Sequence, residues 1–236
     1  MTALRERASP NHDGRGAAMR IDMLVLHYTG MTSAAAALER LCDAAARVSA
    51  HYLVEEDGVL WRLVAEDRRA WHAGISHWQG ESDLNAVSLG IEIVNPGHEW
   101  GYRPFPPPQM DTVERLCLDL LRRHPIPPWR VVGHSDIAPD RKTDPGELFD
   151  WPRLARSGVG IWPEPTRALA AGPPSRDQAA ADLAAIGYRI APDLEAAALT
   201  AFQRRFRPAL CDGALDPETA TRLAEVRRAY DRARIG

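Results

Sequence analysis

The chain has 236 residues, of which 45% are hydrophobic and 26% are charged, and its formal net charge at pH 7 is -3. This length allows a buried core in one or two domains, and the small negative charge does not favour binding to nucleic acid or anionic lipid. No apolar run approaches the roughly 20 residues of a membrane span, and residues 1–20 lack the apolar centre of a secretory signal. We therefore expect a cytoplasmic protein, or a periplasmic one if a leader is missing from this sequence.

Three cysteines, Cys42, Cys117 and Cys211, lie far apart in the sequence. An odd number of widely spaced cysteines does not indicate a disulfide framework. We expect three unpaired thiols in a reducing compartment.

The first predicted elements are a strand and a helix. Residues 21–26 form a mostly apolar run that predicts a buried strand, with His27 at its end. Ser33 precedes an alanine-rich segment and is expected to cap a helix that packs through Leu38 and Leu41.

Residues 51–54 and 59–64 flank the pair Asp57-Gly58, which predicts an antiparallel hairpin. A loop rich in aromatic residues and histidines follows over residues 71–85. Residues 87–94 then predict a central strand that contains a single acid, Glu92.

Residues 106–124 begin with three prolines and carry apolar residues at three- and four-residue spacing, which predicts a helix. A short strand over residues 129–132 is followed closely by His134. Proline, glycine and alanine dominate residues 158–174, which is typical of a linker. The remaining residues predict a small three-helix module, with Asp216 as the cap of a helix that starts at Pro217.

Three residues of the first domain form a candidate metal site: His27, His134 and, ten residues later, Asp144. Catalytic zinc commonly takes three nitrogen or oxygen ligands from the protein and leaves the fourth position to water, so this set would suit hydrolysis. The spacing is a weak signal, because no compact His-x-x-x-His motif is present and single histidines more often form structural hydrogen bonds. The residues alone leave both interpretations open.

Two further charged residues fit a hydrolytic site. A carboxylate in an apolar strand has a desolvation cost unless it is paired or functional, so Glu92 is a candidate general base. The alternative is a carboxylate on a solvated face of the sheet. Lys142, two residues before Asp144, would stabilise an oxyanion, although a loop lysine is usually a solvated charge.

Several segments, in order, resemble the zinc-dependent N-acetylmuramoyl-L-alanine amidases, which share a fold with peptidoglycan recognition proteins. The segments are His27-Tyr28-Thr29, Trp71-His72-Ala73-Gly74, Gly90-Ile91-Glu92, Gly133-His134-Ser135-Asp136-Ile137-Ala138-Pro139 and Lys142-Thr143-Asp144-Pro145-Gly146. They span roughly residues 20 to 155. The resemblance implies a mixed central sheet flanked by helices, one zinc ion per chain held by His27, His134 and Asp144, and catalysis by Glu92 with Lys142.

The same resemblance implies substrate contacts by five residues: Tyr28, Trp71, His72, Ala73 and Asn85. From the residues alone, a core role for Trp71 and a turn role for Asn85 are equally good interpretations. His51 and His77 fall outside the ligand pattern of the family, and His51 is expected to be a strand residue near the site.

The C-terminal module resembles a small helical peptidoglycan-binding domain, through residues 199–206 and 212–220. We therefore expect an N-terminal extension (1–20), a catalytic domain (21–160), a linker (161–175) and a peptidoglycan-binding-like domain (176–236). The resemblance does not indicate which residues of this domain would contact glycan or peptide.

These observations predict an enzyme of cell-wall turnover or recycling. It would hydrolyse the amide bond between the N-acetylmuramoyl or 1,6-anhydro-N-acetylmuramoyl lactyl group and the L-alanine of stem peptides. Its partners would be peptidoglycan fragments or the sacculus, and we expect a monomer. Two alternatives are a peptidoglycan sensor without catalysis and an amidohydrolase for another N-acylated substrate. A sensor would be expected to lack a metal ligand or the general base. This sequence has all of the expected catalytic residues, namely His27, Glu92, His134, Lys142 and Asp144.

Overall fold

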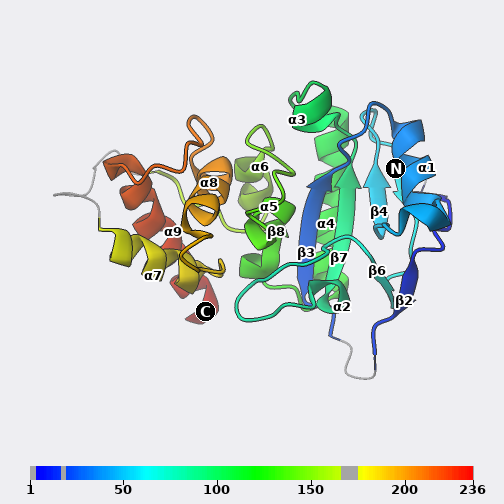
Figure 1. Cartoon of the computed structure of the whole chain (residues 1–236). Helices are drawn as coiled ribbons and strands as arrows, with labels where there is room; N and C mark the ends of the chain where they lie inside the picture. The colour runs from blue at the N-terminus through cyan, green and yellow to red at the C-terminus, as the bar shows by residue number, and fades with distance from the viewer. Residues whose placement is uncertain (1–3, 17–19, 166–174, 236) are drawn as a thin grey trace.

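The structure, a computed structural model, describes residues 4–16, 20–165 and 175–235. A mixed six-stranded sheet lies at its centre, with the strand order β1-β5-β4-β7-β3-β8, and β2 pairs with β6 in a separate ribbon (Figure 1). The strands are β1 (Leu4–Glu6), β2 (His12–Gly14), β3 (Met23–Tyr28), β4 (Tyr52–Val54), β5 (Leu60–Arg62), β6 (Arg68–Ala70), β7 (Ser88–Ile93) and β8 (Val131–Gly133). The predicted mixed sheet flanked by helices is confirmed.

The α-helices are α1 (Ala34–Cys42), α2 (Leu84–Val87), α3 (Gly97–Trp100), α4 (Pro107–Arg123), α5 (His134–Ile137), α6 (Trp151–Arg156), α7 (Arg176–Ile186), α8 (Glu195–Phe206) and α9 (Pro217–Ile235), and two 3-10 turns are η1 (Ala44–Ala46) and η2 (Pro128–Arg130). None of the helices in the described ranges has the length and apolar content that crossing a bilayer requires.

Local sequence signals correctly placed several of these elements. The Ser33 hydroxyl accepts a hydrogen bond from the Ala36 N–H at the start of α1, as expected of an N-cap. Strands β4 and β5 pair antiparallel across the Asp57-Gly58 turn. The Asp216 carboxylate likewise accepts from the Thr219 N–H at the start of α9.

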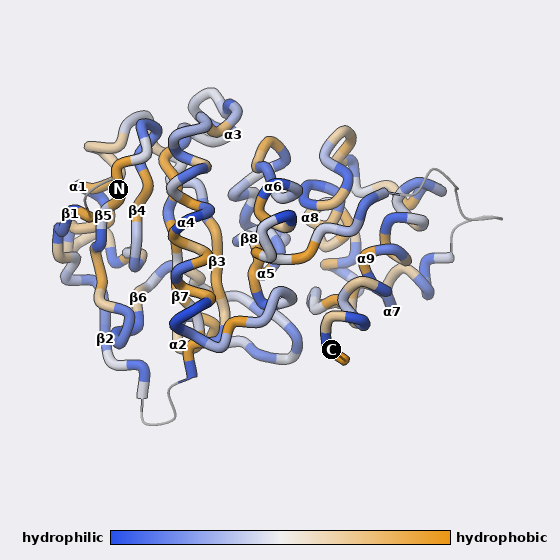
Figure 2. The backbone as a smooth tube through the Cα atoms, turned by 180° about the vertical axis from the view of Figure 1, so that it is seen from behind, coloured by the Kyte–Doolittle hydropathy of each residue, from blue (hydrophilic) through white to orange (hydrophobic). Residues whose placement is uncertain are grey.

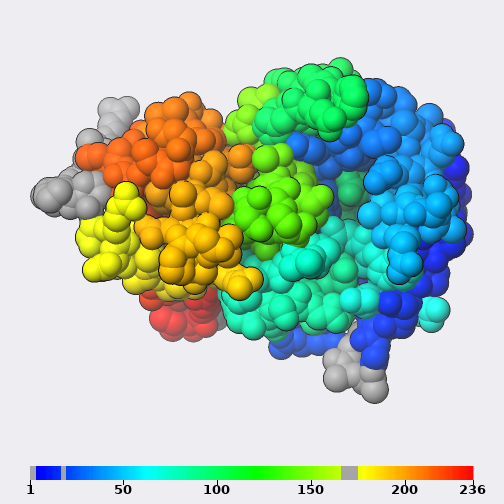
Figure 3. All heavy atoms as spheres, in the orientation of Figure 1, coloured from blue at the N-terminus to red at the C-terminus, as the bar shows by residue number. Residues whose placement is uncertain are grey.

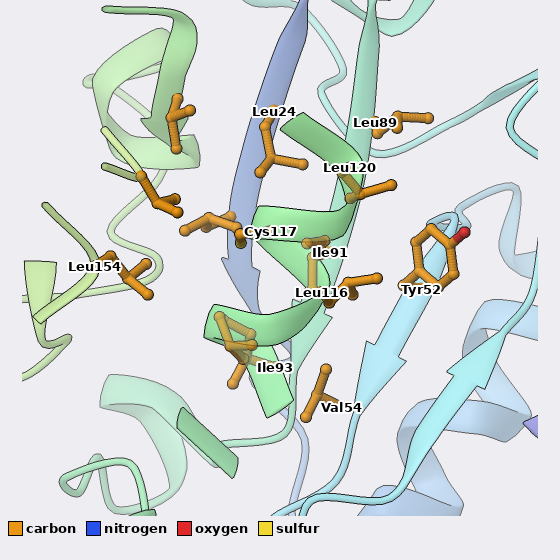
Figure 4. Packing of buried hydrophobic residues seen from close by; sticks show 14 of the residues in the cluster. Leu24, Tyr52, Val54, Leu89, Ile91, Ile93, Leu116, Cys117, Leu120 and Leu154 are labelled. Carbon is orange, nitrogen blue, oxygen red and sulfur yellow. The ribbon is translucent and has the colours of Figure 1, made fainter. Parts of the chain in front are cut away.

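One of the large apolar clusters lies between the sheet and α4. Alternate residues of β3 and β7 point toward α4, which crosses behind these strands in Figure 1 and in front of them in Figure 2. Figure 4 shows the resulting contact of Leu116, Cys117 and Leu120 of α4 with Leu24 and Ile91 of the strands. On the other face of β3, Met23 and Val25 belong to a second buried apolar cluster, and His27 follows them in the same alternation.

The C-terminal helices share a core with the first part of the chain. Met23 and Val132 of the sheet belong to the same buried cluster as Leu183 of α7, Phe202 of α8 and Tyr230 of α9. The expected three-helix module is therefore present, and it packs directly on the sheet-bearing part. Of the expected linker, residues 166–174 lie outside the described residues.

A buried polar network also joins these two parts. The Arg205 guanidinium of α8 donates to Asp136 Oδ2 of α5 at 2.7 Å, and the Tyr188 hydroxyl donates to Asp136 Oδ1 at 2.6 Å. The Arg205 and Asp136 side chains are only 2% and 1% exposed. The Gly133 N–H also donates to Asp136, so the network ends beside His134.

The expected N-terminal extension contains two short strands. Residues Leu4–Glu6 form β1 and extend the edge of the sheet by pairing parallel with β5. Residues His12–Gly14 form β2 and pair antiparallel with β6. The described part of the extension is therefore integrated into the fold.

Candidate active site

The three predicted metal ligands meet at one edge of the sheet. Strands β7, β3 and β8 are adjacent and parallel, so their carboxyl ends lie together. The register pairs His27 with Glu92 and pairs Leu26 with Gly133, which directly precedes His134. His27 therefore lies between Glu92 of β7 and the end of β8, where His134 begins α5.

Three donor atoms of this cluster face one another. His27 Nδ1 lies 2.9 Å from His134 Nδ1 and 3.0 Å from Asp144 Oδ2, and His134 Nδ1 lies 3.1 Å from the same oxygen. All three side chains are buried. The structure thus brings together His27, His134 and Asp144, which are as much as 117 residues apart in the chain.

This donor set fits a metal ion. Zinc bonds histidine nitrogen and carboxylate oxygen at about 2.0–2.2 Å, so tetrahedral ligand atoms lie about 3.3 Å apart, close to the spacing found here. The two imidazole nitrogens face each other and the carboxylate oxygen. A cation between them could bind all three atoms at once, which suits this arrangement better than direct contacts among the three atoms. These three side chains therefore form a possible metal site with three donor atoms from the protein.

The protonation states also favour metal binding, because ligands must be deprotonated. Burial, and then the neighbouring His134, lower the pKa of His27 to about 4. Burial alone would raise the pKa of Asp144, but the two adjacent imidazoles, His134 first, bring it far below its usual value. At neutral pH the His27 imidazole is therefore neutral and the Asp144 carboxylate is ionised.

Glu92 lies next to this cluster with an unsatisfied oxygen. The residue is partly buried, and its Oε2 is shielded from solvent with no hydrogen-bond partner among the described residues. Burial, and then the charge of Asp144, raise its pKa well above the usual value, whereas Lys142 acts in the opposite direction. A carboxylate with a raised pKa, poised beside a metal site, is suited to proton transfer near neutral pH.

A cavity of about 350 Å³ opens onto this cluster. Figure 3 shows a hollow at the centre of the molecule, between the light blue atoms that follow α1 and the green atoms near residue 140. Lys142 lines the cavity together with Glu92 and the three clustered ligands. Its charge therefore faces the same space as the candidate base.

The residues expected to contact substrate divide into two groups. Tyr28, Trp71 and His72 line the cavity. Ala73 is fully buried behind it, and Asn85 is 8% exposed and accepts hydrogen bonds from the backbone N–H groups of His72 and Ala73. The structure thus places Tyr28 and Trp71 within reach of a ligand in the cavity. Asn85 instead holds the backbone of the neighbouring segment through its hydrogen bonds.

Some cavity residues had no signal in the sequence. Arg40 and Ala37 of α1 and Arg141 also line the cavity, and Thr143 hydrogen-bonds the Tyr28 hydroxyl at 2.7 Å. The apolar stripe of α1 indicated which side of the helix is buried, but not that the helix would form a cavity wall. The ring of the buried His51 lies 5.7 Å from that of His72, so the expectation that it lies near the site is confirmed. The expectation that it belongs to a strand is wrong, because β4 begins at Tyr52.

Comparisons with known proteins agree with this arrangement. The family model described as N-acetylmuramoyl-L-alanine amidase matches residues 17–147. The chain is 40% identical over 223 residues to the N-acetylmuramoyl-L-alanine amidase AmiD of Escherichia coli (strain K12), which covers 85% of this chain and 80% of the relative.

Two solved structures resemble the whole fold. One is the complex of AmiD from E. coli with the substrate anhydro-N-acetylmuramic acid-L-Ala-D-γ-Glu-L-Lys, at a TM-score of 0.79 and 36% identity, over 93% of this chain and 91% of that one. The other is AmpDh3 from Pseudomonas aeruginosa in complex with anhydromuramic pentapeptide. Its TM-score is 0.81 and its sequence identity 33%, over 95% of this chain and 96% of that one. With this coverage, the likeness extends into the C-terminal helices. From the motif order, the matched residues and these structural likenesses, the chain belongs to the N-acetylmuramoyl-L-alanine amidase family.

Proposed function

We propose that this enzyme hydrolyses the amide bond between the muramoyl lactyl group and L-alanine in peptidoglycan fragments, with zinc held by His27, His134 and Asp144. The hydrolase activity follows from membership of the family. The observation that carries the assignment of residues is the convergence of three ligand atoms beside the unpaired Glu92 Oε2. When bound, zinc supplies Lewis acidity that activates water and polarises the scissile carbonyl.

Glu92 serves as the general base and then as the general acid. Its carboxylate accepts a proton from the attacking water while a new C–O bond forms at the carbonyl carbon. It then transfers that proton to the nitrogen of L-alanine as the C–N bond breaks, which releases the free amine. The raised pKa of Glu92 supports this role, because a carboxyl group that holds a proton more tightly than usual can accept it from water and then return it to the leaving amine.

Lys142 stabilises the negative charge that develops on the carbonyl oxygen. Lys142 lines the same cavity as Glu92, and a positive charge at this place stabilises the tetrahedral state more than the neutral amide.

Substrate binding uses the cavity that opens onto the cluster. Tyr28 and Trp71 contact the muropeptide directly, since both line the cavity, and the Arg47 guanidinium over the Trp71 ring restrains that side chain. Asn85 contributes indirectly, because its Oδ1 accepts hydrogen bonds from the backbone N–H groups of His72 and Ala73. Ala73 contributes through its carbonyl oxygen, which lies 3.2 Å from His134 Nε2.

The two relatives solved with anhydromuramyl peptides support soluble fragments as substrates. We also propose that the protein is a monomer. We propose that it acts in the cytoplasm, because Cys42, Cys117 and Cys211 are free thiols, which suit a reducing compartment. Residues 176–236 would add affinity for glycan or stem peptide. Rates on soluble anhydromuropeptides and on intact sacculi, with co-sedimentation of the full chain on sacculi, test these assignments.

Incubation of the zinc-loaded protein with an anhydromuropeptide should release free stem peptide, detected by mass spectrometry. Glu92→Gln should lower turnover about 10²- to 10⁴-fold, as expected for loss of a general base, while zinc content stays unchanged. Bound but uncleaved muropeptide with the wild-type protein would instead indicate a sensor. Wild-type turnover by Glu92→Gln would remove Glu92 from the mechanism.

A further inference from the structure

Residues 72 and 73, which follow β6, contact the imidazoles of His27 and His134 on the side that faces away from Asp144. His27 Nε2 lies 3.1 Å from His72 Nδ1, and His134 Nε2 lies 3.2 Å from the carbonyl oxygen of Ala73. In each case the other ring nitrogen, Nδ1, faces Asp144. Two adjacent residues therefore contact the far nitrogen of each metal-site histidine.

The contact at His134 has only one possible direction. A backbone carbonyl accepts hydrogen bonds and cannot donate, so the hydrogen must be on His134 Nε2. In a neutral imidazole the other nitrogen then has a free lone pair. Ala73 thus leaves His134 Nδ1 ready to bind a metal.

The tautomer of His27 follows from a longer chain of hydrogen bonds. Ser88 Oγ lies 2.5 Å from the carbonyl oxygen of Leu84, so the Ser88 hydroxyl must donate to it. Ser88 Oγ also lies 3.2 Å from His72 Nε2, and with its one hydrogen already used it can only accept there. The hydrogen of His72 is therefore on Nε2, and His72 Nδ1 can accept from His27 Nε2–H.

A neutral His72 is required for this direction, and its surroundings favour that state. The side chain is 8% exposed and lies against the rings of His27 and His51. Among the residues in the described ranges, no carboxylate accepts a hydrogen bond from His72. A buried cation without a counterion is strongly unfavourable.

The sequence of β7 leaves room for the hydrogen bonds that connect His27, His72 and Ser88. Ser88, Gly90 and Glu92 alternate along the strand and share the face opposite α4. A Cβ atom at Gly90 would lie only 2.5 Å from His72 Cγ, so a side chain there would displace the ring. Asn85 completes the support, because its Oδ1 accepts from the N–H groups of both His72 and Ala73, at 3.1 and 2.8 Å.

We propose that His72 is a positioning residue that fixes His27 in the Nε2–H tautomer, through Ser88 and the carbonyl of Leu84, so that His27 Nδ1 presents its lone pair to the metal. The inference rests on the proposed zinc site. It gives His72 a role in holding the metal ligand in addition to its place in the cavity wall. Partners behind metal-bound histidines typically contribute 10- to 100-fold to metal affinity.

The test compares variants by zinc affinity, measured by competition with a chelator, and by the tautomer of His27 in the metal-free protein, read from long-range ¹H–¹⁵N NMR. His72→Leu removes the acceptor and should weaken zinc binding about 10- to 100-fold, with loss of the pure Nε2–H signature. His72→Asn keeps an acceptor oxygen near the position of Nδ1 and should recover most of the affinity. Ser88→Ala is a milder change that removes the acceptor from His72, and it should weaken binding without altering the cavity wall.

His77→Leu is the matched control, because it removes an imidazole that forms no contact with the cluster, and its zinc affinity should equal that of the wild type. Unchanged zinc affinity and tautomer in His72→Leu and Ser88→Ala, with only KM raised, would overturn the proposal and make His72 a substrate contact. Equal losses in His72→Asn and His72→Leu would also overturn it, by assigning the effect to packing. Failure of the proposed function is distinguishable, since it would appear as wild-type protein that binds zinc and leaves muropeptides intact.

Discussion

The buried ion pair between Arg205 and Asp136 should determine how firmly the C-terminal helices are held. Arg205→Met retains an apolar stem of similar length. Among the described residues, it leaves the buried Asp136 carboxylate with only the Gly133 N–H and the Tyr188 hydroxyl as donors. Removal of one partner of a buried pair costs about 3–5 kcal/mol. We expect the lower part of that range, because the two remaining donors still stabilise the carboxylate.

This magnitude is measurable by urea unfolding of the metal-free protein, with the free energy of unfolding extrapolated to water. For a chain of this size, about 3–5 kcal/mol corresponds to a fall in Tm of roughly 6 to 20 °C. Arg153→Met is the matched control: Arg153 is 26% exposed and pairs with Asp111 and Glu114, whose side chains are 50% and 22% exposed. Exposed pairs contribute only about 0.2–1 kcal/mol.

Asp136→Asn in the Arg205→Met background removes the stranded charge and should recover part of the lost stability. Because Met23, Val132 and Phe202 share one core, both parts of the chain should unfold in a single transition. A loss below about 1 kcal/mol in Arg205→Met, equal to that of Arg153→Met, would refute the reasoning about the buried pair.

Two further predictions concern the metal and pH. Asp144→Ala should abolish stoichiometric zinc binding, because it removes one of three ligands, and full zinc occupancy by metal analysis would show that the ligand set is wrong. Burial alone would raise the pKa of Glu66, but hydrogen bonds from Arg123, Tyr52 and His124 lower it to about 2. Since the folded state binds this proton less tightly than the unfolded chain, ionised Glu66 stabilises the fold above about pH 4.5, and this stabilisation is lost as the pH falls toward 2. Glu66→Gln should therefore lower stability at pH 7 and flatten its pH dependence in that window. An unchanged slope in acid titrations would contradict the assignment.

Local sequence signals were sufficient where the determining physics is local. The Ser33 cap, the Asp57-Gly58 hairpin and the start of α9 after Asp216 each depend on hydrogen bonds within a few residues. The periodicity of α4 likewise indicated its buried side. The motifs also predicted the ligand set, with His27 and His134 at strand ends.

Other features depended on segments that are distant in the chain. The sequence alone did not indicate that Arg40 of α1 would line the cavity, that Ala73 would hold His134, or that Arg205 would reach Asp136. Each of these contacts joins residues whose spacing carries no periodic signal, and each is decided by strand register and by which helix covers which face. Sequence pattern therefore predicted many of the elements, and the motif resemblance indicated the family and predicted the reacting groups. Tertiary packing decided how the imidazoles are oriented and how the C-terminal helices are attached, because burial and hydrogen-bond direction exist only once the chain has folded.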